Sequence, residues 1–372
     1  MRVLVTGAKG FIGKNLILRL SERNDVDIVT FTREDNLNSL DKVISETDCI
    51  FHLAGINRPN DVKEFDIGNN QLTQYICDSI FRSGKDIPII YTSSIQADID
   101  NEYGISKRKA EQALFELKFK HAISVYIYRL PNVFGKWARP NYNSVVATFC
   151  HNIARDIPIQ INNPSSLVRL VYVDDVVDEF MSVMDGNLTS EVDLKVEPEY
   201  SISLGELANQ ITSFKDSRAN LISEKVGTGL TRALYSTYVS YLDPDDFIYE
   251  VPKYGDDRGV FVEMLKTKDA GQFSFFTAHP GITRGGHYHH TKTEKFLVIK
   301  GKACFRFRHM ITGELYELFT ADDKAEIVET VPGWTHDVTN VGDDDLICML
   351  WANEIFDRDK PDTIASHVST EA

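Results

Sequence analysis

The chain has 372 residues, of which 42% are hydrophobic, and a formal charge of −15, so its length fits two domains of ~150 residues each. The negative charge argues against nucleic-acid binding, and no run of ~20 apolar residues predicts a membrane span. Five scattered cysteines without CxxC spacing favour reduced, buried thiols. Together with the absence of a signal peptide, they predict a cytoplasmic protein.

Up to about residue 245, strand-like runs alternate with helix-like runs. Strands are predicted at 2–5, 26–31, 49–53, 88–91 and 125–128, and helices from residue 11, over 73–81 and from residue 103. This alternation predicts a parallel sheet with helices on both faces. Residues 1–245 are therefore expected to form a Rossmann-like, doubly wound α/β domain.

After about residue 252, short strands are separated by turns that contain Gly, Asp and Pro. They are predicted at 272–276, 295–299, 303–307, 325–331 and 346–351. Residues 246–372 are therefore expected to form an all-β jelly-roll domain. The acidic, turn-rich segment 242–246 is typical of a linker between domains.

A GxxGxxG turn stands between the first strand and the first helix, at Gly7, Gly10 and Gly13. Gly7 permits a tight turn, Gly10 lets the backbone approach a pyrophosphate, and Gly13 lets the helix pack closely on the strand. The pattern predicts dinucleotide binding. Thr32 and Arg33 stand where NAD-preferring proteins carry an acidic residue, and a cation there suits the 2′-phosphate of NADPH; the alternative is a solvent-exposed arginine.

Tyr103 and Lys107 stand at i and i+4, on one face of a predicted helix. The pair suits acid–base work, because a nearby cation is expected to favour the phenolate and so to lower the pKa of the phenol. Ser93 and Ser94 follow a predicted buried strand, and either can offer a hydroxyl to the same substrate oxygen.

These motifs, with segments 51–55, 129–135 and 172–176, resemble the extended short-chain dehydrogenase/reductase family. The resemblance implies that Tyr103 is the proton donor, that Lys107 holds the nicotinamide ribose and that Ser94, or Ser93, orients the substrate oxygen. Asn69 matches the asparagine of the family's proton relay; an ordinary polar residue on a helix is the alternative. The cofactor-binding residues so implied are Gly7, Lys9, Gly10, Phe11, Ile12, Gly13, Thr32, Arg33, Leu53, Ala54, Gly55, Asn69, Tyr103 and Lys107.

The chain departs from this family between Arg33 and the strand at 49–53. Only about twenty residues lie there, where the family usually has a further strand and helix. We therefore expect the sheet to lack one βα unit, and the acidic residue that contacts adenine has no clear counterpart.

His287, His289 and Glu294 form a metal-ligand pattern with the later His336. The first two alternate on a predicted strand and so face the same side, and Gly301 is expected to close a hairpin. Three imidazoles and a carboxylate predict a divalent-metal site.

The spacing G-x5-H-x-H-x4-E-x6-G and the segment 332–340 resemble the two motifs of the cupin family. His290 has the opposite strand parity and is expected outside the site. Pro332 and Gly333 are adjacent, whereas the family has a residue between them. A metal-free cupin whose histidines bind substrate directly is the alternative.

Segments 257–263 and 284–288 resemble deoxysugar-nucleotide 3,5-epimerases. The resemblance implies arginines that face a diphosphate and a histidine, here His287, that removes a carbon-bound proton. Either the metal is the electrophile on the ketone oxygen or it only positions His287, and the sequence leaves both open. The substrate-binding residues expected in the two domains are Asn132, Arg169, Arg258, Glu263 and Arg284.

A short-chain reductase followed by a cupin over the whole chain resembles the CapF-type bifunctional UDP-sugar 3-epimerase/4-reductases of capsule and O-antigen synthesis. The resemblance implies C3 epimerisation of UDP-2-acetamido-2,6-dideoxy-β-L-arabino-hexos-4-ulose and then C4 reduction with NADPH. The product is UDP-2-acetamido-2,6-dideoxy-β-L-talose, a precursor of UDP-N-acetyl-L-fucosamine. A homodimer and one zinc ion per chain are also implied.

Two other functions are weighed against this one. A sugar-nucleotide 4-epimerase or dehydratase with a passenger cupin is disfavoured, because Ile95 and Gln96 stand where dehydratases commonly carry a carboxylate pair. A non-catalytic NADPH-sensing regulator is disfavoured by the intact Tyr103, Lys107 and metal-ligand set.

Overall fold

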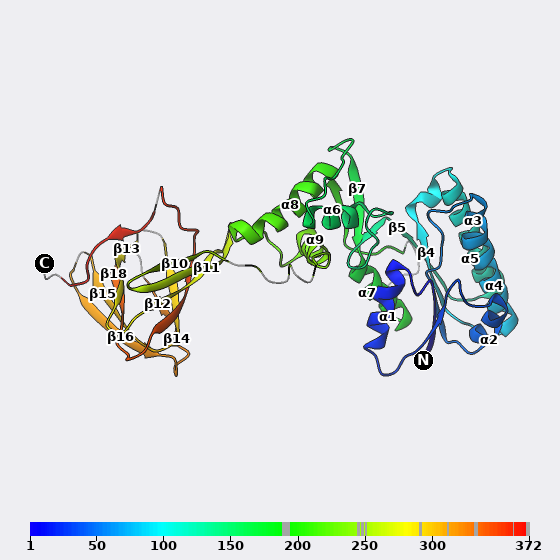
Figure 1. Cartoon of the computed structure of the whole chain (residues 1–372). Coiled ribbons are helices and arrows are strands. Elements are labelled where there is room, and N and C mark those ends of the chain that lie inside the picture. The colour runs from blue at the N-terminus through cyan, green and yellow to red at the C-terminus, as the bar shows by residue number, and fades with distance from the viewer. Residues whose placement is uncertain are drawn as a thin grey trace. The chain divides into compact units, whose positions relative to one another are not determined.

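The computed structural model describes residues 1–187, 194–243, 246, 249, 251–289, 292–310, 312–330, 334–359 and 361–369. The chain divides into two compact units, Met1–Ile211 with Ala233–Tyr241 and Thr212–Arg232 with Leu242–Ala372. The first is α/β and the second is rich in strands (Figure 1). This division differs from the expected domains 1–245 and 246–372 in segments 212–232 and 242–245, which group with the second unit.

Five parallel strands form the central sheet of the first unit, in the order β2-β1-β3-β4-β5. They are β1 (Arg2–Thr6), β2 (Asp27–Phe31), β3 (Cys49–His52), β4 (Ile89–Ser94) and β5 (Val125–Leu130). Each lies where the sequence predicts a strand. Among the described residues no strand lies beyond β2, and β3 pairs directly with β1. The expectation that the sheet lacks one βα unit is thereby confirmed.

Alternate residues of these strands enter two apolar cores, one on each face of the sheet. Val3 and Val5 pack on the side of α1 and α7, and Leu4 packs on the side of α2, α4 and α5 (Figure 1). These helices are α1 (Phe11–Ser21), α2 (Leu40–Ser45), α4 (Leu72–Ser83), α5 (Glu102–His121) and α7 (Val173–Met184). A sheet covered on both faces leaves the carboxyl ends of its strands as the place for a ligand.

Shorter elements and a small sheet complete the first unit. The small sheet has the order β6-β7-β8. The short helices are η1 (Leu37–Ser39), α3 (Lys63–Phe65), the π-helix η2 (Asp66–Gln71) and η3 (Ile95–Asp98). The remaining elements are β6 (Asn132–Phe134), α6 (Val145–Ala154), β7 (Leu167–Tyr172) and β8 (Glu199–Ser203), followed by α8 (Leu204–Asn220) and α9 (Gly229–Val239), which both cross the boundary between the units.

Two sheets enclose the core of the second unit. One has the order β10-β11-β12-β19-β14-β17, with β9 beside β11, and the other has the order β16-β15-β18-β13-β20. Aromatic and aliphatic side chains such as Phe276, Phe296 and Phe305 fill the space enclosed by the sheets. The strands are β9 (Ile222–Ser223), β10 (Lys253–Asp256), β11 (Gly259–Thr267), β12 (Gly271–Ala278), β13 (Thr283–Tyr288), β14 (Glu294–Lys300), β15 (Lys302–His309), β16 (Leu315–Ala321), β17 (Val328–Glu329), β18 (Trp334–Asn340), β19 (Leu346–Ala352) and β20 (Ile364–Ala365).

Gly301 does not close a hairpin, so that expectation is wrong. It has a positive φ of 95° between β14 and β15, but β14 pairs with β17 and β19 while β15 pairs with β16 and β18. The turn therefore carries the chain from one sheet to the other. A glycine suits it because other residues rarely adopt this conformation.

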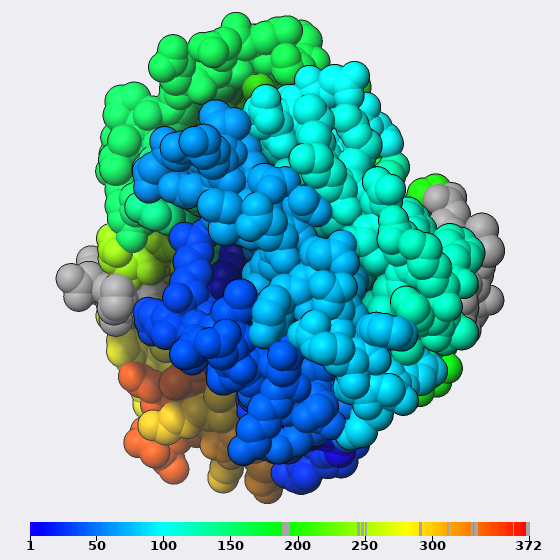
Figure 2. Space-filling model, turned by 90° about the vertical axis from the view of Figure 1, so that its right-hand side faces the viewer, coloured from blue at the N-terminus to red at the C-terminus, as the bar shows by residue number. Residues whose placement is uncertain are grey.

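Figure 2 shows the first residues of the chain, in the darkest blue, on the floor of a hollow bordered by lighter blue segments. This hollow is open to the solvent on the face shown. Within the described part of the chain, every helix is too short or too polar to cross a lipid bilayer.

Candidate functional sites

The glycine turn after β1 is packed too closely against neighbouring backbone to accept a side chain at Gly7. Gly7 has a φ of +71°, and a Cβ on it would come within 2.7 Å of the Ala54 backbone nitrogen. The amide of Gly10 donates to the Gly7 carbonyl at 2.8 Å. Gly10 is also the N-cap of α1 and offers no side chain to the first helical turn. This helix start can therefore accept a phosphate, as a bound dinucleotide requires.

The other predicted cofactor residues surround this turn. Phe11 and Ile12 begin α1, and Leu53, Ala54 and Gly55 follow β3. Beyond β2, the Asp35 carboxylate accepts two hydrogen bonds from Thr32, one from the backbone amide at 2.7 Å and one from the hydroxyl at 2.9 Å. Arg33 is exposed, and Lys9 forms an exposed ion pair with Glu34.

Helix α5 brings Tyr103 and Lys107 to the end of β4. The Asn101 side chain caps α5 by accepting from the Gly104 amide at 2.7 Å. Lys107 is only 4% exposed, and its ammonium donates to the Tyr91 hydroxyl at 3.2 Å and to the Thr92 carbonyl at 2.9 Å. It lies 6.0 Å from the centre of the Tyr103 ring.

The two serines after β4 have different partners. Ser93 is buried and its hydroxyl donates to Glu111. Ser94 caps η3 by accepting from the Gln96 amide at 3.2 Å, and it lies close enough to Tyr103 to influence the pKa of the phenol. Ser94, rather than Ser93, is thus the hydroxyl beside Tyr103.

Burial dominates the acid–base behaviour of this group. It raises the pKa of Tyr103 above its ordinary value of 10.0, although the nearby Ser94 hydroxyl opposes the change. The expectation that this pKa is lowered is therefore wrong, because burial of the phenol disfavours its charged form and raises the pKa. Burial also lowers the pKa of Lys107 to about 8, and the nearby charge of Glu111 opposes that shift.

Asn69 belongs to the same site, and it is buried rather than a polar residue on a helix surface. Its Oδ1 accepts from the Ile56 amide at 2.7 Å, and its Nδ2 donates to the Ser106 hydroxyl at 2.9 Å. A Cβ on Gly55 would lie 3.0 Å from Asn69 Oδ1 and 3.2 Å from Lys107 Nζ. Asn69 and Lys107 thus meet beside Gly55, at a π-helix of the kind that often marks a functional site.

Asn132 and Arg169 lie together in the small sheet of the same unit. The Asn132 amide donates to the Arg169 carbonyl at 3.0 Å. The Arg169 guanidinium is held by Glu199, which raises the pKa of the arginine and keeps it charged.

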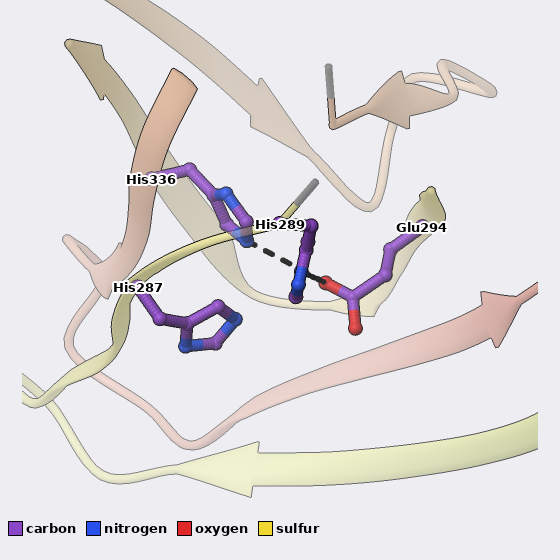
Figure 3. A group of neighbouring side chains, drawn as sticks. All are labelled: His287, His289, Glu294 and His336. Carbon is purple, nitrogen blue, oxygen red and sulfur yellow. Dashed lines mark hydrogen bonds and ion pairs between the residues drawn. The ribbon is translucent and has the colours of Figure 1, made fainter. Parts of the chain in front are cut away.

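His287, His289, Glu294 and His336 converge in the second unit (Figure 3), and their donor atoms all lie within 4.8 Å of one another. His287 stands opposite His336 on paired strands, and the register of β13 shifts between Gly285 and His287. Such a bulge redirects the side chain that follows it. Glu294 comes from the other sheet, and His289 lies just beyond the end of β13.

The donor set fits a divalent metal ion. Nε2 of His336 is buried and makes no hydrogen bond within the described residues; it faces Oε2 of Glu294 at 3.5 Å. Nδ1 of His289 lies within hydrogen-bond distance of the Asp362 carbonyl. Because a carbonyl only accepts, Nδ1 carries the proton of the neutral ring, and the lone pair of Nε2 is left to bind a metal. Three imidazoles and one carboxylate suit zinc and several other divalent ions.

The charges of the cluster agree with this fit. Burial, followed by the proximity of His336, lowers the pKa of His287 to about 4. Burial raises the pKa of Glu294, but the hydrogen bond with His289, the proximity of His336 and the charge of Lys292 outweigh it and hold the pKa well below its usual range. A neutral imidazole and an ionised carboxylate are the forms that bind metal.

Sequence reasoning missed Lys292, which lines the same cavity. The cavity has a volume of about 270 Å³ and also includes Gln272, His287 and Glu294 in its lining. Lys292 is buried, and its ammonium lies 3.3 Å from Glu294 Oε1 and 5.5 Å from the centre of the Phe356 ring. Lys292 lies in the loop before β14, where the alternation of residues along a strand makes no prediction. The available signal was its position in the sequence between His289 and Glu294, two of the predicted metal ligands.

The charged residues predicted to bind substrate in this unit lie apart from the described lining of that cavity. Arg258 pairs with Asp256. Arg284 lies 5.3 Å from the centre of the Phe276 ring and donates to the Thr277 carbonyl at 3.1 Å. Glu263 accepts from Gln272, which does line the cavity, at 3.1 Å. The predictions on His290 and on the adjacent Pro332 and Gly333 lie outside the described residues.

Two family models match the chain. One, described as the NAD dependent epimerase/dehydratase family, matches residues 3–192, and the other, the polysaccharide biosynthesis C-terminal domain, matches residues 254–364. The first carries the glycine turn, Tyr103 and Lys107, and the second carries the His and Glu cluster.

Known proteins match both halves together. A UDP-2-acetamido-2,6-beta-L-arabino-hexul-4-ose reductase of Pseudomonas aeruginosa is 62% identical over 100% of both chains. The crystal structure of the capsular polysaccharide assembling protein CapF of Staphylococcus aureus superposes with a TM-score of 0.92, with 44% identity over 99% of this chain and 100% of that one. A UDP-glucuronic acid 4-epimerase of Bacillus cereus, at 17% identity and a TM-score of 0.55 over 65% of this chain and 98% of that one, shares the fold of the first part alone.

Proposed function

Because the chain belongs to the NAD dependent epimerase/dehydratase family and, over its full length, to the family of the Pseudomonas reductase, we propose that it is a bifunctional sugar-nucleotide enzyme. It epimerises C3 of UDP-2-acetamido-2,6-dideoxy-β-L-arabino-hexos-4-ulose and then reduces C4 with NADPH. The product is UDP-2-acetamido-2,6-dideoxy-β-L-talose, an intermediate on the way to UDP-N-acetyl-L-fucosamine for capsule or O-antigen. The observation that carries the proposal is the presence of two complete sets of catalytic groups, one in each unit.

The first unit supplies the reduction. The glycine turn of Gly7, Gly10 and Gly13 would hold NADPH, which would supply a hydride for C4 of the ketone. Ser94 orients the carbonyl oxygen, and Tyr103 gives its proton to that oxygen as the carbonyl electron pair moves onto it. The raised pKa of Tyr103 supports this role, because the phenol is protonated before the reaction. Lys107 and Asn69 hold the cofactor ribose and the proton path.

The second unit supplies the epimerisation. The ketone at C4 makes the proton on C3 acidic, and His287 is neutral near pH 7 because burial holds its pKa at about 4. We assign proton removal from C3 to His287, and reprotonation on the opposite face inverts the centre. A divalent metal, proposed to be one zinc ion held by His287, His289, Glu294 and His336, would either polarise the ketone oxygen or position His287.

The chemistry fixes the order of the two steps. Epimerisation beside a carbonyl requires the ketone, and reduction removes it. C3 inversion must therefore precede C4 reduction, and the reduction traps the inverted product.

The decisive experiment is NMR in heavy water with the UDP-4-keto-6-deoxy-L-sugar, first without and then with NADPH. Deuterium should enter C3 before the cofactor is added, and the ketone should disappear only afterwards. Reduction without deuterium at C3 would leave a simple 4-ketoreductase. Tight NADPH binding without turnover of 4-keto sugar nucleotides would instead indicate a regulator.

The proposal has three further parts: preference for NADPH over NADH, a homodimeric state and a cytoplasmic location. The exposed Arg33 after β2 supports the first, because a cation at this position can bind the 2′-phosphate. A comparison of the dissociation constants of NADPH and NADH tests the cofactor preference. Light scattering tests the homodimeric state, and cell fractionation tests the location.

A further inference from the structure

Glu111 is a buried carboxylate of α5 that the proposed mechanism does not use. It is only 2% exposed and stands one turn beyond Lys107, on the same face of the helix. A buried carboxylate is costly unless hydrogen-bond donors and opposite charges surround it. Its partners therefore show what it holds in place.

These partners come from the ends of two neighbouring strands. The Ser93 hydroxyl of β4 donates to Glu111 Oε1. Arg129 of β5 binds both carboxylate oxygens, from Nε at 2.9 Å and from Nη2 at 2.6 Å, while its Nη1 donates to Asp98 at 2.7 Å. A two-pronged pair of this kind fixes orientation as well as charge. Glu111 thus ties α5 to the carboxyl ends of β4 and β5.

Glu111 is connected to the reductase site through Ser93 and through its charge near Lys107. Ser93 precedes Ser94, the hydroxyl beside Tyr103. Lys107 is buried, which disfavours its charged form, and the charge of Glu111 opposes that effect. The groups that face Lys107 or this carboxylate from the elements packed around them are His52 of β3, Asn69 of η2, Tyr91, Thr92 and Ser93 of β4, Asp98 of η3, Tyr103 of α5 and Arg129 of β5.

We propose that Glu111 is a positioning residue of the reductase site: its carboxylate keeps the Lys107 ammonium in place along α5 and, through Ser93 and Arg129, fixes the end of β4 that carries Ser94. The inference rests on the proposed C4 reduction. Glu111 acts through Lys107 and Ser93, and it exchanges no proton with the substrate.

The Glu111→Gln variant of the full chain tests the electrostatic part. The ammonium of Lys107 is lost as pH rises through its pKa, so NADPH oxidation should fall on the alkaline side. Without the charge of Glu111 that pKa drops further, and the alkaline limb of kcat/KM should move to lower pH by about one unit. A limb that coincides with that of the unchanged protein, whatever the melting temperature, overturns the proposal.

Arg129→Gln tests the same charge with the opposite sign. Removing the guanidinium leaves the Glu111 charge less neutralised, which favours the Lys107 ammonium, so the alkaline limb should move to higher pH. A purely structural role would not shift the two variants in opposite directions. Should Glu111→Gln fail to fold, this variant decides, and an unshifted or lowered limb rejects the proposal.

Two controls complete the set. Glu116→Gln makes the same change on the exposed part of α5, where the carboxylate pairs with Lys120, and should leave the profile unchanged. Glu111→Asp retains the negative charge, so its alkaline limb of kcat/KM should lie closer to that of the unchanged protein than the limb of Glu111→Gln does. If the unchanged protein does not turn over, the proposed function fails, but the pH dependence of NADPH affinity, followed by the cofactor's fluorescence, tests Glu111 by the same shifts.

Discussion

Burial of the Tyr103 side chain raises the pKa of its phenol, and a proton donor benefits from this shift. A phenolate at rest would have no proton to give to the alkoxide that forms at C4. Ser94 therefore acts best by orienting the substrate oxygen. The cofactor and substrate complete the surroundings in which Tyr103 then loses its proton.

Tyr103→Phe removes this proton while keeping the ring. NADPH oxidation should fall on the order of 100- to 10,000-fold, because the alkoxide has no acid beside it. Deuterium exchange at C3 should persist, since the other unit performs it. NMR in heavy water and absorbance at the NADPH band measure the two steps separately, and loss of both would contradict independent sites.

His287→Asn tests the epimerase centre. An asparagine keeps a polar side chain but cannot accept the C3 proton, so exchange at C3 should stop. NADPH binding, followed by fluorescence, should be unchanged. Metal content measured on the same sample separates loss of the base from loss of the ion, and continued exchange would remove His287 from the mechanism.

Residue spacing predicted the pair in the first unit and the four-residue cluster in the second. Tyr103 and Lys107 meet because an i, i+4 pair shares a helix face, and the His and Glu pattern converges across two sheets. Contacts between residues distant in the sequence could not be predicted in this way. The Glu111 carboxylate, for example, accepts hydrogen bonds from Ser93 and Arg129. The direction of the pKa shift of Tyr103 was also missed, because it depends on how deeply the fold buries the phenol.

At the level of elements, the start of α5 is packed against η3 through Gly104. A Cβ on Gly104 would overlap the carbonyl oxygens of Gln96 and Ile99. This close approach keeps Tyr103 near Ser94, the residue at the start of η3.

Gly104→Ala should push these two elements apart. We expect a loss of about 1–3 kcal/mol in the free energy of unfolding and at least a tenfold drop in NADPH oxidation. Gly227→Ala is the matched control, because a Cβ there meets nothing within 4 Å. Full activity of Gly104→Ala in a steady-state assay would show that the helix start tolerates the displacement.

The sequence predicted the strands better than it predicted their pairing. All five parallel strands of the first unit lie where residue patterns place them, because buried strands read as continuous apolar runs. Gly301 was taken as a hairpin turn, since glycine marks a turn without showing which strands it joins. The pairing of β14 with β19 depends on residues about fifty positions apart.

For the whole molecule, two compact units with separate sets of catalytic groups predict separate responses to metal. A ligand that binds only the folded state stabilises it by about 2.7 kcal/mol at 100 times its dissociation constant. Removing metal with a chelator should therefore lower the melting temperature of the second unit and stop exchange at C3. NADPH binding should not change.

Calorimetry with and without added zinc measures this difference, and a shift of every transition would show that the units unfold together. Calcium in place of zinc is the control. Because calcium prefers oxygen ligands, it should not raise the melting temperature through a site of three imidazoles and one carboxylate. Zinc that left every transition in place would count against the metal centre.

The contacts of residues 362–366 have a consequence for how the protein matures. The Asp362 carbonyl lies at His289, its carboxylate accepts from the Lys292 amide, and β20 pairs with β13 beside His287. During synthesis, at about 5–20 residues per second, His287, His289, Glu294 and His336 all leave the ribosome before this segment does. The nascent chain thus exposes the four side chains of the cluster before residues 362–366 arrive to support them, so the cluster can adopt its native geometry only after translation has passed residue 366.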